Sequence, residues 1–319
     1  MKLSDRRIMV TGCAGFIGSH LAEALLARGN EVVGLDNLSA GKKEFMSGML
    51  DNERFEFING DLLTMDLAPA LRDVEVLCHL AANPDVRIGA KNTKVVFEQN
   101  IEVTYRLLEA GKDSGVKDIL FPSTSTVYGE TEVIPTPEDY GPLVPISVYG
   151  ASKLADEALI SSYCHTFDQS AVLYRFANVV GTRSTHNVLH DFIRKLRADP
   201  QHLEILGAEP GTMKSYVHVK DCVAGMIAGA EAAGEQVEIY NIGSKDWMSV
   251  KDIADIVVEE MHLAGVEYQW TGGVKGGRGW VGDVKKMLLS VDRLESRGWQ
   301  PRLSSREAIR RAVQEILAH

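Results

Sequence analysis

Cysteine is scarce in this chain, and its few copies are scattered. The 319 residues include four cysteines, Cys13, Cys78, Cys164 and Cys222, and no two of them form a CxxC pair. Disulfide frameworks and structural zinc sites both need cysteines in recognisable sets, so this spacing predicts neither. We therefore expect reduced thiols in a cytoplasmic protein.

Long apolar runs and an excess of positive charge are also missing. No apolar stretch approaches the roughly 18 residues that a membrane-spanning helix needs. The opening residues, MKLSDRRIMVTG, lead into a glycine-rich stretch instead of the apolar core of a signal peptide. The 34 Lys and Arg face 44 Asp and Glu, giving a net charge of −10. Such acidity argues against nucleic acid as a partner, and we expect no membrane partner either.

Histidine gives little support for a metal site. Among nine histidines only His186 and His190 lie close together, four residues apart. A polar loop leading into a helix explains this pair better than metal binding does. We predict no bound metal.

What the sequence does contain is a regular alternation of apolar and amphipathic segments. Short apolar runs such as RIMVTG, EVVGLD, VEVLCHLAA and DILFPST alternate with helical patterns such as SHLAEALLARG and QNIEVTYRLLEAG. This alternation predicts an α/β fold whose doubly wound parallel sheet, of the Rossmann type, is covered on both faces. We assign residues 1–180 to this domain, and the chain returns to it around 217–241. Residues 181–319 form a smaller α+β substrate-binding lobe, with helices near 188–198, 220–232, 250–263 and 305–317.

The segment VTGCAGFIGSH places three glycines between the first strand and the first helix. Gly12, Gly15 and Gly18 would allow a tight turn and a close approach of backbone N–H groups to a pyrophosphate, and Phe16 and Ile17 would open the helix beside it. A glycine trio alone also fits an ordinary turn. Its position in a strand–loop–helix unit favours dinucleotide binding.

Acidic residues follow the second and third strands. Asp36 lies 18 residues after Gly18, where a carboxylate accepts both ribose hydroxyls of NAD and repels the extra phosphate of NADP. Asn37 and Ser39 follow it, and no Arg stands beside them, which favours NAD; a simple turn is the alternative. Asp61, with Leu62, lies where an adenine amino group could be held.

Tyr149 and Lys153 lie four residues apart in the helical pattern VYGASKLADEALISSYCHTF, so they share one helix face. Lowering a tyrosine pKa from about 10 to about 7 takes about 4 kcal/mol. One ammonium about 4 Å away supplies about that much at an effective dielectric near 20, and an oxidised nicotinamide adds positive potential. The pair can therefore form a phenolate general base. The spacing alone also fits a solvated helix face with an aromatic anchor.

Taken together, these features resemble the extended short-chain dehydrogenase/reductase family. Within it, the chain is most similar to the NAD-dependent sugar-nucleotide epimerase and dehydratase branch, of the UDP-glucose (UDP-galactose) 4-epimerase type. The resemblance rests on VTGCAGFIGSHL, DNLSAG, HLAANPDVR, STSTVYG, YGASK, RFANVVG, KSYVHVKD, YNIGS and GDVKKMLLSVDRL.

The resemblance implies a role for each matching residue. Tyr149 would be the base, Lys153 its electrostatic partner and a ribose contact, and Thr124 the hydroxyl that binds the oxygen at sugar carbon 4. Asn178 would contact the substrate diphosphate, with Asn83 as a further substrate residue. Contacts with the cofactor are implied for Ala81, Ala82, Asn100, Ser123 and Phe176.

The residues after Thr124 narrow the reaction. Related dehydratases and decarboxylases carry carboxylates there, whereas this chain has Ser125 and Thr126, which cannot serve as carboxylate acids or bases. Reactions that remove water or carbon dioxide from the sugar are therefore disfavoured. What remains is epimerisation at carbon 4, interconverting UDP-glucose and UDP-galactose through a transient 4-keto intermediate, with hydride moved to bound NAD and back.

The substrate lobe departs from the family pattern. Lys214 precedes SYVHV where Arg is common, and Trp280 replaces the Arg expected two residues before GDV. Arg278 is then the candidate for gripping the diphosphate and Asp283 matches a ribose contact, although either could be a solvated loop residue. Met287 falls where relatives carry a residue that limits sugar size, so hexose, N-acetyl sugar and uronic acid stay open.

Two other functions remain as alternatives. One is a net oxidoreductase on the same scaffold, acting on a sugar nucleotide or a small alcohol and exchanging its cofactor at every turnover. The other is a cofactor-sensing protein without chemistry, against which the intact trio of Thr124, Tyr149 and Lys153 argues. The resemblance also implies a homodimer, packed through the helices that carry EVTYRLLEA and DEALISSY.

Overall fold

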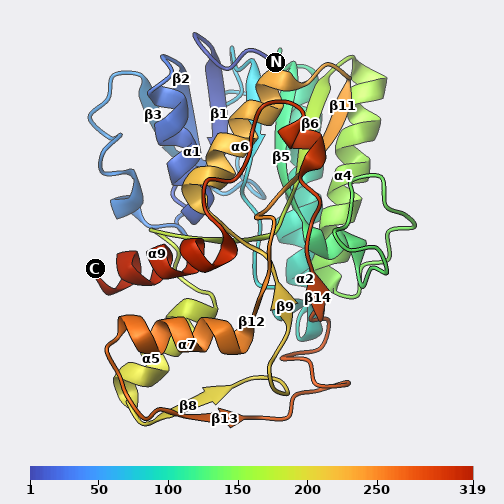
Figure 1. Ribbon diagram of the computed structural model, residues 1–319. Coiled ribbons are helices and arrows are strands. Elements are labelled where there is room, and N and C mark those ends of the chain that lie inside the picture. Colours follow the sequence, from blue (N-terminus) through green and yellow to red (C-terminus); the bar gives the residue numbers. More distant parts are fainter. Residues whose placement is uncertain (319) are drawn as a thin grey trace.

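The computed structural model describes residues 1–318 and is built around a seven-stranded parallel sheet (Figure 1). The strand order is β11-β6-β5-β4-β1-β2-β3. Most of these strands are buried nearly throughout, as the apolar runs in the sequence predicted. The predicted doubly wound α/β fold is confirmed. The strands are β1 (Arg7–Thr11), β2 (Glu31–Asp36), β3 (Phe55–Asn59), β4 (Val76–His79), β5 (Asp118–Thr124), β6 (Ser170–Phe176) and β11 (Val237–Ile242).

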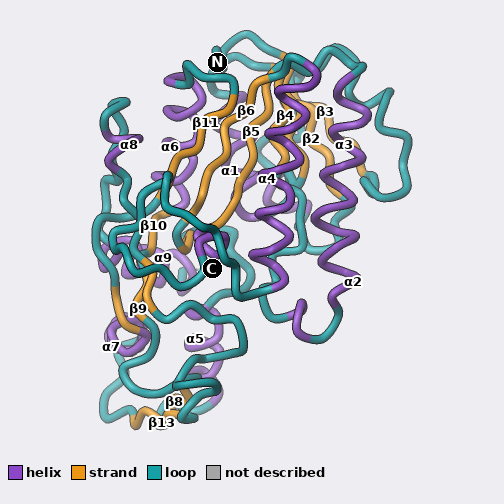
Figure 2. Tube along the Cα trace, turned by 90° about the vertical axis from the view of Figure 1, so that its right-hand side faces the viewer, coloured by secondary structure: helices purple, strands orange, loops and turns teal. Residues whose placement is uncertain are grey.

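Helices cover both faces of the sheet. On one face α1 (Phe16–Leu26) packs beside α6 (Val219–Ala232), and their apolar residues share one core with the sheet. On the other face α3 (Val103–Lys112) packs beside α4 (Val148–Phe167) over a second core. Figure 2 shows α3 and α4 running side by side along the sheet. The sheet is therefore shielded from water on both sides.

A smaller lobe lies below the open end of the sheet (Figure 1). It has its own apolar core, formed by α5, α7 and α9 with the parallel pair β8 and β13. The main elements are α5 (Val188–Ala198), β8 (His202–Ile205), α7 (Val250–Glu260), β13 (Glu267–Trp270) and α9 (Ser305–Leu317). Short strands join the lobes: β7 (Asn178–Val180), β9 (Met213–Lys214), β10 (Tyr216–His218), β12 (Met248–Ser249) and β14 (Lys286–Met287). Between them the chain returns to the large sheet, where β11 pairs with β6.

The segment before α3 is not the continuous α-helix that its sequence pattern predicts. It consists of α2 (Thr93–Val96) and a π-helical turn, Phe97–Glu102, that leads into α3. Asn100 lies in this turn, fully buried, where its side chain accepts the Asn83 N–H at 2.8 Å and donates to Ser152 Oγ at 2.9 Å. A π-turn inserts one residue into the helix and so redirects a side chain, a change that hydrophobic periodicity does not reveal.

The remaining short elements are α8 (Asp292–Glu295) and three 3₁₀ turns at Lys43–Met46, Ile88–Ala90 and Ser125–Tyr128. All four cysteines are buried free thiols. Within residues 1–318, no helix has both the length and the apolar character needed to cross a membrane.

Candidate active site

Several of the predicted site residues, among them Asp36, Thr124 and Phe176, lie where the parallel strands end. Thr11, Asp36, His79, Thr124 and Phe176 are the last residues of β1, β2, β4, β5 and β6. Carboxyl ends of neighbouring parallel strands share one edge of the sheet, and strand order reverses direction around β1 and β4. Ligands of doubly wound sheets bind at this edge.

The glycine loop between β1 and α1 has the form of an anion site. Gly15 caps α1 without a side chain, and no acidic residue occupies the first turn, so the N–H groups of Phe16, Ile17 and Gly18 have no partner inside the helix. The loop also leaves no room for larger residues. A Cβ on Gly18 would lie 2.1 Å from Gly12 O, and Gly12 itself has φ +70°. These backbone groups fit the pyrophosphate of a dinucleotide.

Asp36 lies beside this loop with only 8% of its surface exposed. Its carboxylate accepts N–H groups of Ala14 at 3.0 Å and Leu38 at 2.8 Å. Burial raises the pKa of Asp36, while these two hydrogen bonds act to lower it. The carboxylate is thus held at the end of β2, where the sequence predicts a ribose contact.

Asn37 and Asp61 meet next to Asp36. Asn37 Nδ2 donates to Asp61 Oδ2 at 3.2 Å, and Asp61 Oδ1 accepts the Leu63 N–H at 2.9 Å. Ser39 is exposed, and its N–H donates to Asn37 Oδ1 at 3.0 Å. Leu62 is buried. The ends of β2 and β3 therefore bring the predicted adenosine-binding residues together.

The Thr124 hydroxyl is prepared to donate a hydrogen bond. Its Oγ1 accepts both the N–H and the hydroxyl of Thr126, each at 3.2 Å. With its acceptor positions occupied, the proton of Thr124 is free for another acceptor. Since a Cβ on Gly150 would lie 2.8 Å from Thr126 O, the start of α4 packs directly against this hydroxyl run.

Tyr149 and Lys153 lie on this first part of α4. Lys153 is 4% exposed, and its Nζ lies 4.1 Å from the centre of the Phe121 ring on β5. β5 ends in Thr124, so strand and helix together bring the predicted catalytic trio to one region.

The pKa of Tyr149 differs from the sequence expectation. Burial, and next the negative charge of Asp156, raise it to about 12 in the chain alone. Burial lowers the pKa of Lys153, against the opposing charges of Asp156 and Glu157. In the chain alone the pKa of Tyr149 is therefore far from the near-neutral value expected with Lys153 and an oxidised nicotinamide, because burial and the carboxylate of Asp156 both raise it.

Several residues predicted to touch the cofactor use their polar groups within the protein. Ser123 Oγ donates to Glu157, whose carboxylate also binds Arg175. The N–H of Ala81 donates to Thr11 Oγ1 at 3.1 Å, and the Asn100 side chain bonds as described above. Ala82 is half-buried, and the Phe176 ring lies in the core stacked on Tyr174.

A cavity of about 580 Å³ lies between the sheet edge and the smaller lobe. Ser125, Thr126 and Asn178 line it, with Met287 on β14. Asn178 Nδ2 donates to the Ser215 carbonyl oxygen at 3.2 Å. Asn83 is not among the lining residues and bonds to Gln99 at 2.9 Å instead. The cavity thus begins at the hydroxyl run and extends into the second lobe.

The smaller lobe supplies one buried ion pair to this cavity. Lys214 and Asp283 are hydrogen-bonded to each other, and Lys214 Nζ lies 5.0 Å from the centre of the Trp280 ring. All three residues line the cavity. Arg278 does not: its guanidinium binds Glu130 and the Asp283 carbonyl oxygen. The sequence predicted that Arg278 binds the substrate diphosphate, but Trp280 is the residue that lies in the cavity wall.

Other basic residues of the cavity were missed from the sequence. Arg87, His186, His190 and Arg194 all line it. His190 and Arg194 are four residues apart on α5, a spacing that signals a shared face, whereas nothing in the sequence places Arg87 opposite them. Residues 1–318 hold no cluster of three His, Cys, Asp or Glu side chains arranged to bind a metal ion.

The fold and the strand-end site define a Rossmann-type dinucleotide-binding protein with a Tyr-x-x-x-Lys helix. Residues 8–243 match the family described as "NAD dependent epimerase/dehydratase family". The chain therefore belongs to this NAD-dependent epimerase/dehydratase family, and its cofactor is NAD. The resemblance noted from the motifs and the cofactor prediction are both confirmed.

Several relatives match this chain over nearly its whole length. The UDP-glucose 4-epimerase of Mycolicibacterium smegmatis is 33% identical over 97% of each chain. A solved structure of a UDP-galactose 4-epimerase is 39% identical, with a TM-score of 0.86 over 98% of this chain and 99% of that one. The UDP-glucuronic acid 4-epimerase from Bacillus cereus, solved with UDP-glucuronic acid and NAD, is 30% identical, with a TM-score of 0.87 over the same shares.

Proposed function

We propose that this enzyme inverts carbon 4 of a nucleotide sugar, with UDP-glucose and UDP-galactose as its substrates. The observation that carries the proposal is the hydroxyl run at the end of β5. Thr124 has a free proton to donate, while Ser125 and Thr126 line the cavity where an eliminating enzyme needs a carboxyl group. The names of the relatives support a uridine nucleotide and carbon 4.

Each residue of the trio has a defined task in this reaction. Thr124 donates to the oxygen at carbon 4 and fixes its position, and Tyr149 removes the proton from that hydroxyl. Lys153 stabilises the phenolate that Tyr149 must form. The glycine loop and Asp36 would hold NAD, which would supply the acceptor and the donor of the hydride at carbon 4. If the sugar turns over in the cavity between the loss and the return of this hydride, the same Tyr149 returns its proton and the stereocentre is inverted.

The wall of the cavity at Met287 leaves the choice of sugar open. Met287 is a flexible, unbranched side chain, and it forms part of the wall instead of a rigid barrier. Lys214 binds the nucleotide end of the substrate through a single positive charge, and Asp283 is already paired with that charge. Both substituted sugars and uronic acids therefore belong in the test.

The test is incubation of the purified protein with UDP-glucose, UDP-N-acetylglucosamine and UDP-glucuronate without added NAD, followed by chromatography of the products. We expect UDP-galactose from UDP-glucose, no accumulation of NADH, and loss of at least about 100-fold in rate for Tyr149→Phe. Accumulation of NADH with an alcohol substrate, and no inverted sugar, would assign the chain to net oxidation instead. Unchanged activity of Tyr149→Phe would remove the tyrosine from the mechanism.

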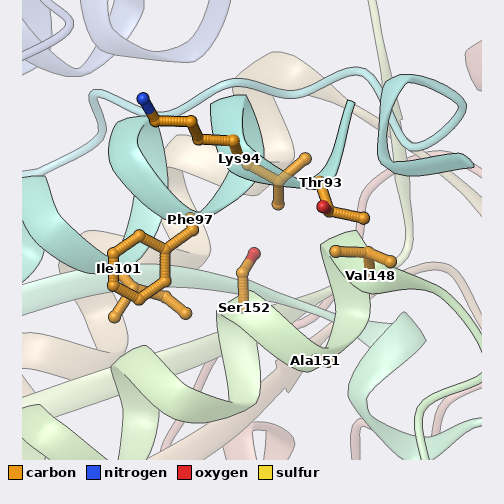
Figure 3. A pocket seen from close by; sticks show the side chains of 8 residues that line it. Thr93, Lys94, Phe97, Ile101, Val148, Ala151 and Ser152 are labelled. Atoms are coloured by element: carbon orange, nitrogen blue, oxygen red, sulfur yellow. The ribbon is translucent and has the colours of Figure 1, made fainter. Parts of the chain in front are cut away.

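We further propose that the enzyme is a cytoplasmic homodimer joined through α3 and α4. This face carries the exposed aromatic residues Phe97, Tyr105 and Phe167, and beside it lies a groove of about 380 Å³. Figure 3 shows Phe97 and Ile101 on one wall of this groove and Val148 on the other. Large apolar side chains exposed along one face are a feature of contact surfaces between proteins.

A further inference from the structure

A carboxylate outside the catalytic trio lies buried behind it. Asp156 is on α4, three residues after Lys153 and seven after Tyr149, and only 1% of its surface is exposed. Neither of its oxygens has a hydrogen-bond partner within residues 1–318. Burying a carboxylate without hydrogen bonds lowers the stability of the fold, so the presence of Asp156 at this position needs an explanation other than packing.

The groups on the sheet side of Asp156 are neutral. Thr11 Oγ1 accepts two backbone N–H groups and therefore donates its own proton to His79 Nδ1 at 2.9 Å. The other ring nitrogen of His79 donates to Thr104 Oγ1 at 3.1 Å, and Thr104 donates to the Asn100 carbonyl oxygen at 2.8 Å. Burial, and next the positive charge of Lys153, lower the pKa of His79 to about 3, so the His79 ring is neutral and supplies no positive charge to Asp156.

Thr104 therefore does little to offset the cost of burying the Asp156 carboxylate. Its hydroxyl is near enough to act in lowering the pKa of Asp156, but its single proton is directed at the Asn100 carbonyl oxygen. Burial dominates and raises the pKa of Asp156 to about 6, against the opposing charge of Lys153.

The neighbouring carboxylate, Glu157, already has its own cation. Arg175 binds both of its oxygens, at 2.7 and 3.1 Å, in a buried pair. Lys153 is thus the positive group that Asp156 faces, and Asp156 is the carboxylate near Lys153 whose charge is not taken up elsewhere. Tyr149 lies within reach of the same negative charge.

We propose that Asp156 is a positioning residue that acts as the buried counter-charge of Lys153 and sets the pH range in which the Tyr149–Lys153 pair works. The inference rests on the proposed role of this pair as general base. The negative charge keeps the Lys153 ammonium protonated in a dry site. The same charge holds Tyr149 in its neutral form, so that the phenolate forms only where further positive charge, such as an oxidised nicotinamide, faces it.

The expected consequence has a definite sign. Removing one negative charge favours the less positive state of both neighbours, so the pKa values of Tyr149 and Lys153 both fall. The acid limb of the pH–rate profile, which follows Tyr149, and the alkaline limb, which follows Lys153, should both move to lower pH by about one unit. Below about pH 6 the wild-type carboxylate is itself protonated, so the two profiles should converge there.

The experiment compares Asp156→Asn with the wild-type holoenzyme over the pH range, and repeats the comparison with Asp156→Ala in case the buried amide impairs folding. The matched control is Thr104→Val, which disturbs the same cluster without changing its charge and should leave both limbs in place. A uniform loss of rate with unmoved limbs would give Asp156 a purely structural role and overturn the proposal. Limbs that move upward or in opposite directions, or an equal shift in Thr104→Val, would overturn it too.

A second readout does not require the proposed function. The near-ultraviolet absorbance of tyrosinate is titrated in NAD-loaded protein without any sugar, with Tyr149→Phe subtracted as background. We expect the midpoint of the Tyr149 signal about one pH unit lower in Asp156→Asn. If no nucleotide sugar is converted by the wild type, the proposed function fails, but this titration still judges Asp156: an unmoved midpoint would overturn its role.

Discussion

At the scale of single residues, Thr124 illustrates how the protein directs one proton. A threonine hydroxyl has one proton and two acceptor positions. Both acceptor positions receive hydrogen bonds from Thr126, from its backbone N–H and its side chain. The proton of Thr124 is therefore left for an acceptor at the open end of the sheet, and the 3₁₀ turn at Ser125–Tyr128 keeps this arrangement in place.

This arrangement predicts different outcomes for two substitutions. Thr124→Val keeps the shape but removes the proton donor, and we expect kcat to fall about 100-fold because the oxygen at carbon 4 loses its hydrogen bond. Thr124→Ser keeps the donor and should retain most of the activity. Steady-state kinetics on the sugar that the enzyme inverts give the measurement. Equal rates in the Val and Ser variants would contradict the assigned donor role.

At the scale of secondary structure elements, α3 and α4 serve two purposes. Their inner faces cover the sheet and carry Lys153 and Asp156, whereas their outer face exposes aromatic rings. Tyr105 on α3 is 48% exposed, and Phe167 at the end of α4 is 41% exposed. A self-complementary contact through this face would bury the rings of both copies at once.

The proposed dimer can be broken on this face. Tyr105→Glu places a charge where an aromatic ring would be buried, so we expect the variant to elute and sediment as a monomer. Val274→Glu is the matched control, because Val274 is also exposed but lies in the glycine-rich loop of the other lobe. Sedimentation velocity over a range of concentrations distinguishes the states. An equal dimer fraction in both variants would rule out this face.

At the scale of the whole molecule, Glu315 ties the C-terminal helix to the junction of the two lobes. Its carboxylate accepts the Thr182 N–H at 3.2 Å and lies 3.1 Å from His218 Nε2, while Arg311 approaches at 3.1 Å. Burial acts to raise the pKa of Glu315, but the hydrogen bonds from His218 and Arg311 hold it below its ordinary value. The ionised carboxylate is therefore the form that stabilises the fold.

The stability of the molecule should depend on pH through this residue. A carboxyl group with a lowered pKa stabilises the fold above its unfolded value of 4.5, and this contribution is lost as the pH falls through the folded pKa. We expect Glu315→Gln to lose about 2 kcal/mol near pH 7, and the deficit should shrink below about pH 4.5. Thermal melts across this range measure it, with the exposed Glu53→Gln as control. A deficit that does not change with pH would contradict the charge-based explanation.

Local spacing in the sequence was enough to predict the cofactor end of the site. Three glycines between a strand and a helix, and an acidic residue at the end of the next strand, are sequence-local features, and the parallel sheet brings them together without further information. The same holds for Tyr149 and Lys153, because a helix fixes the geometry of residues four apart. These features were sufficient to predict the fold class and the cofactor, and they are the basis for the proposal that a tyrosine is the base.

The sugar end and the charge balance were decided by tertiary structure alone. Arg278 is directed to Glu130 and away from the cavity, whereas Arg87 reaches the cavity from the other lobe. Asp156 reads in the sequence as one more acidic residue of a helix, yet packing buries it beside Lys153. Desolvation and pairing depend on which side chains the fold brings together from distant segments, and spacing along the chain does not contain that information.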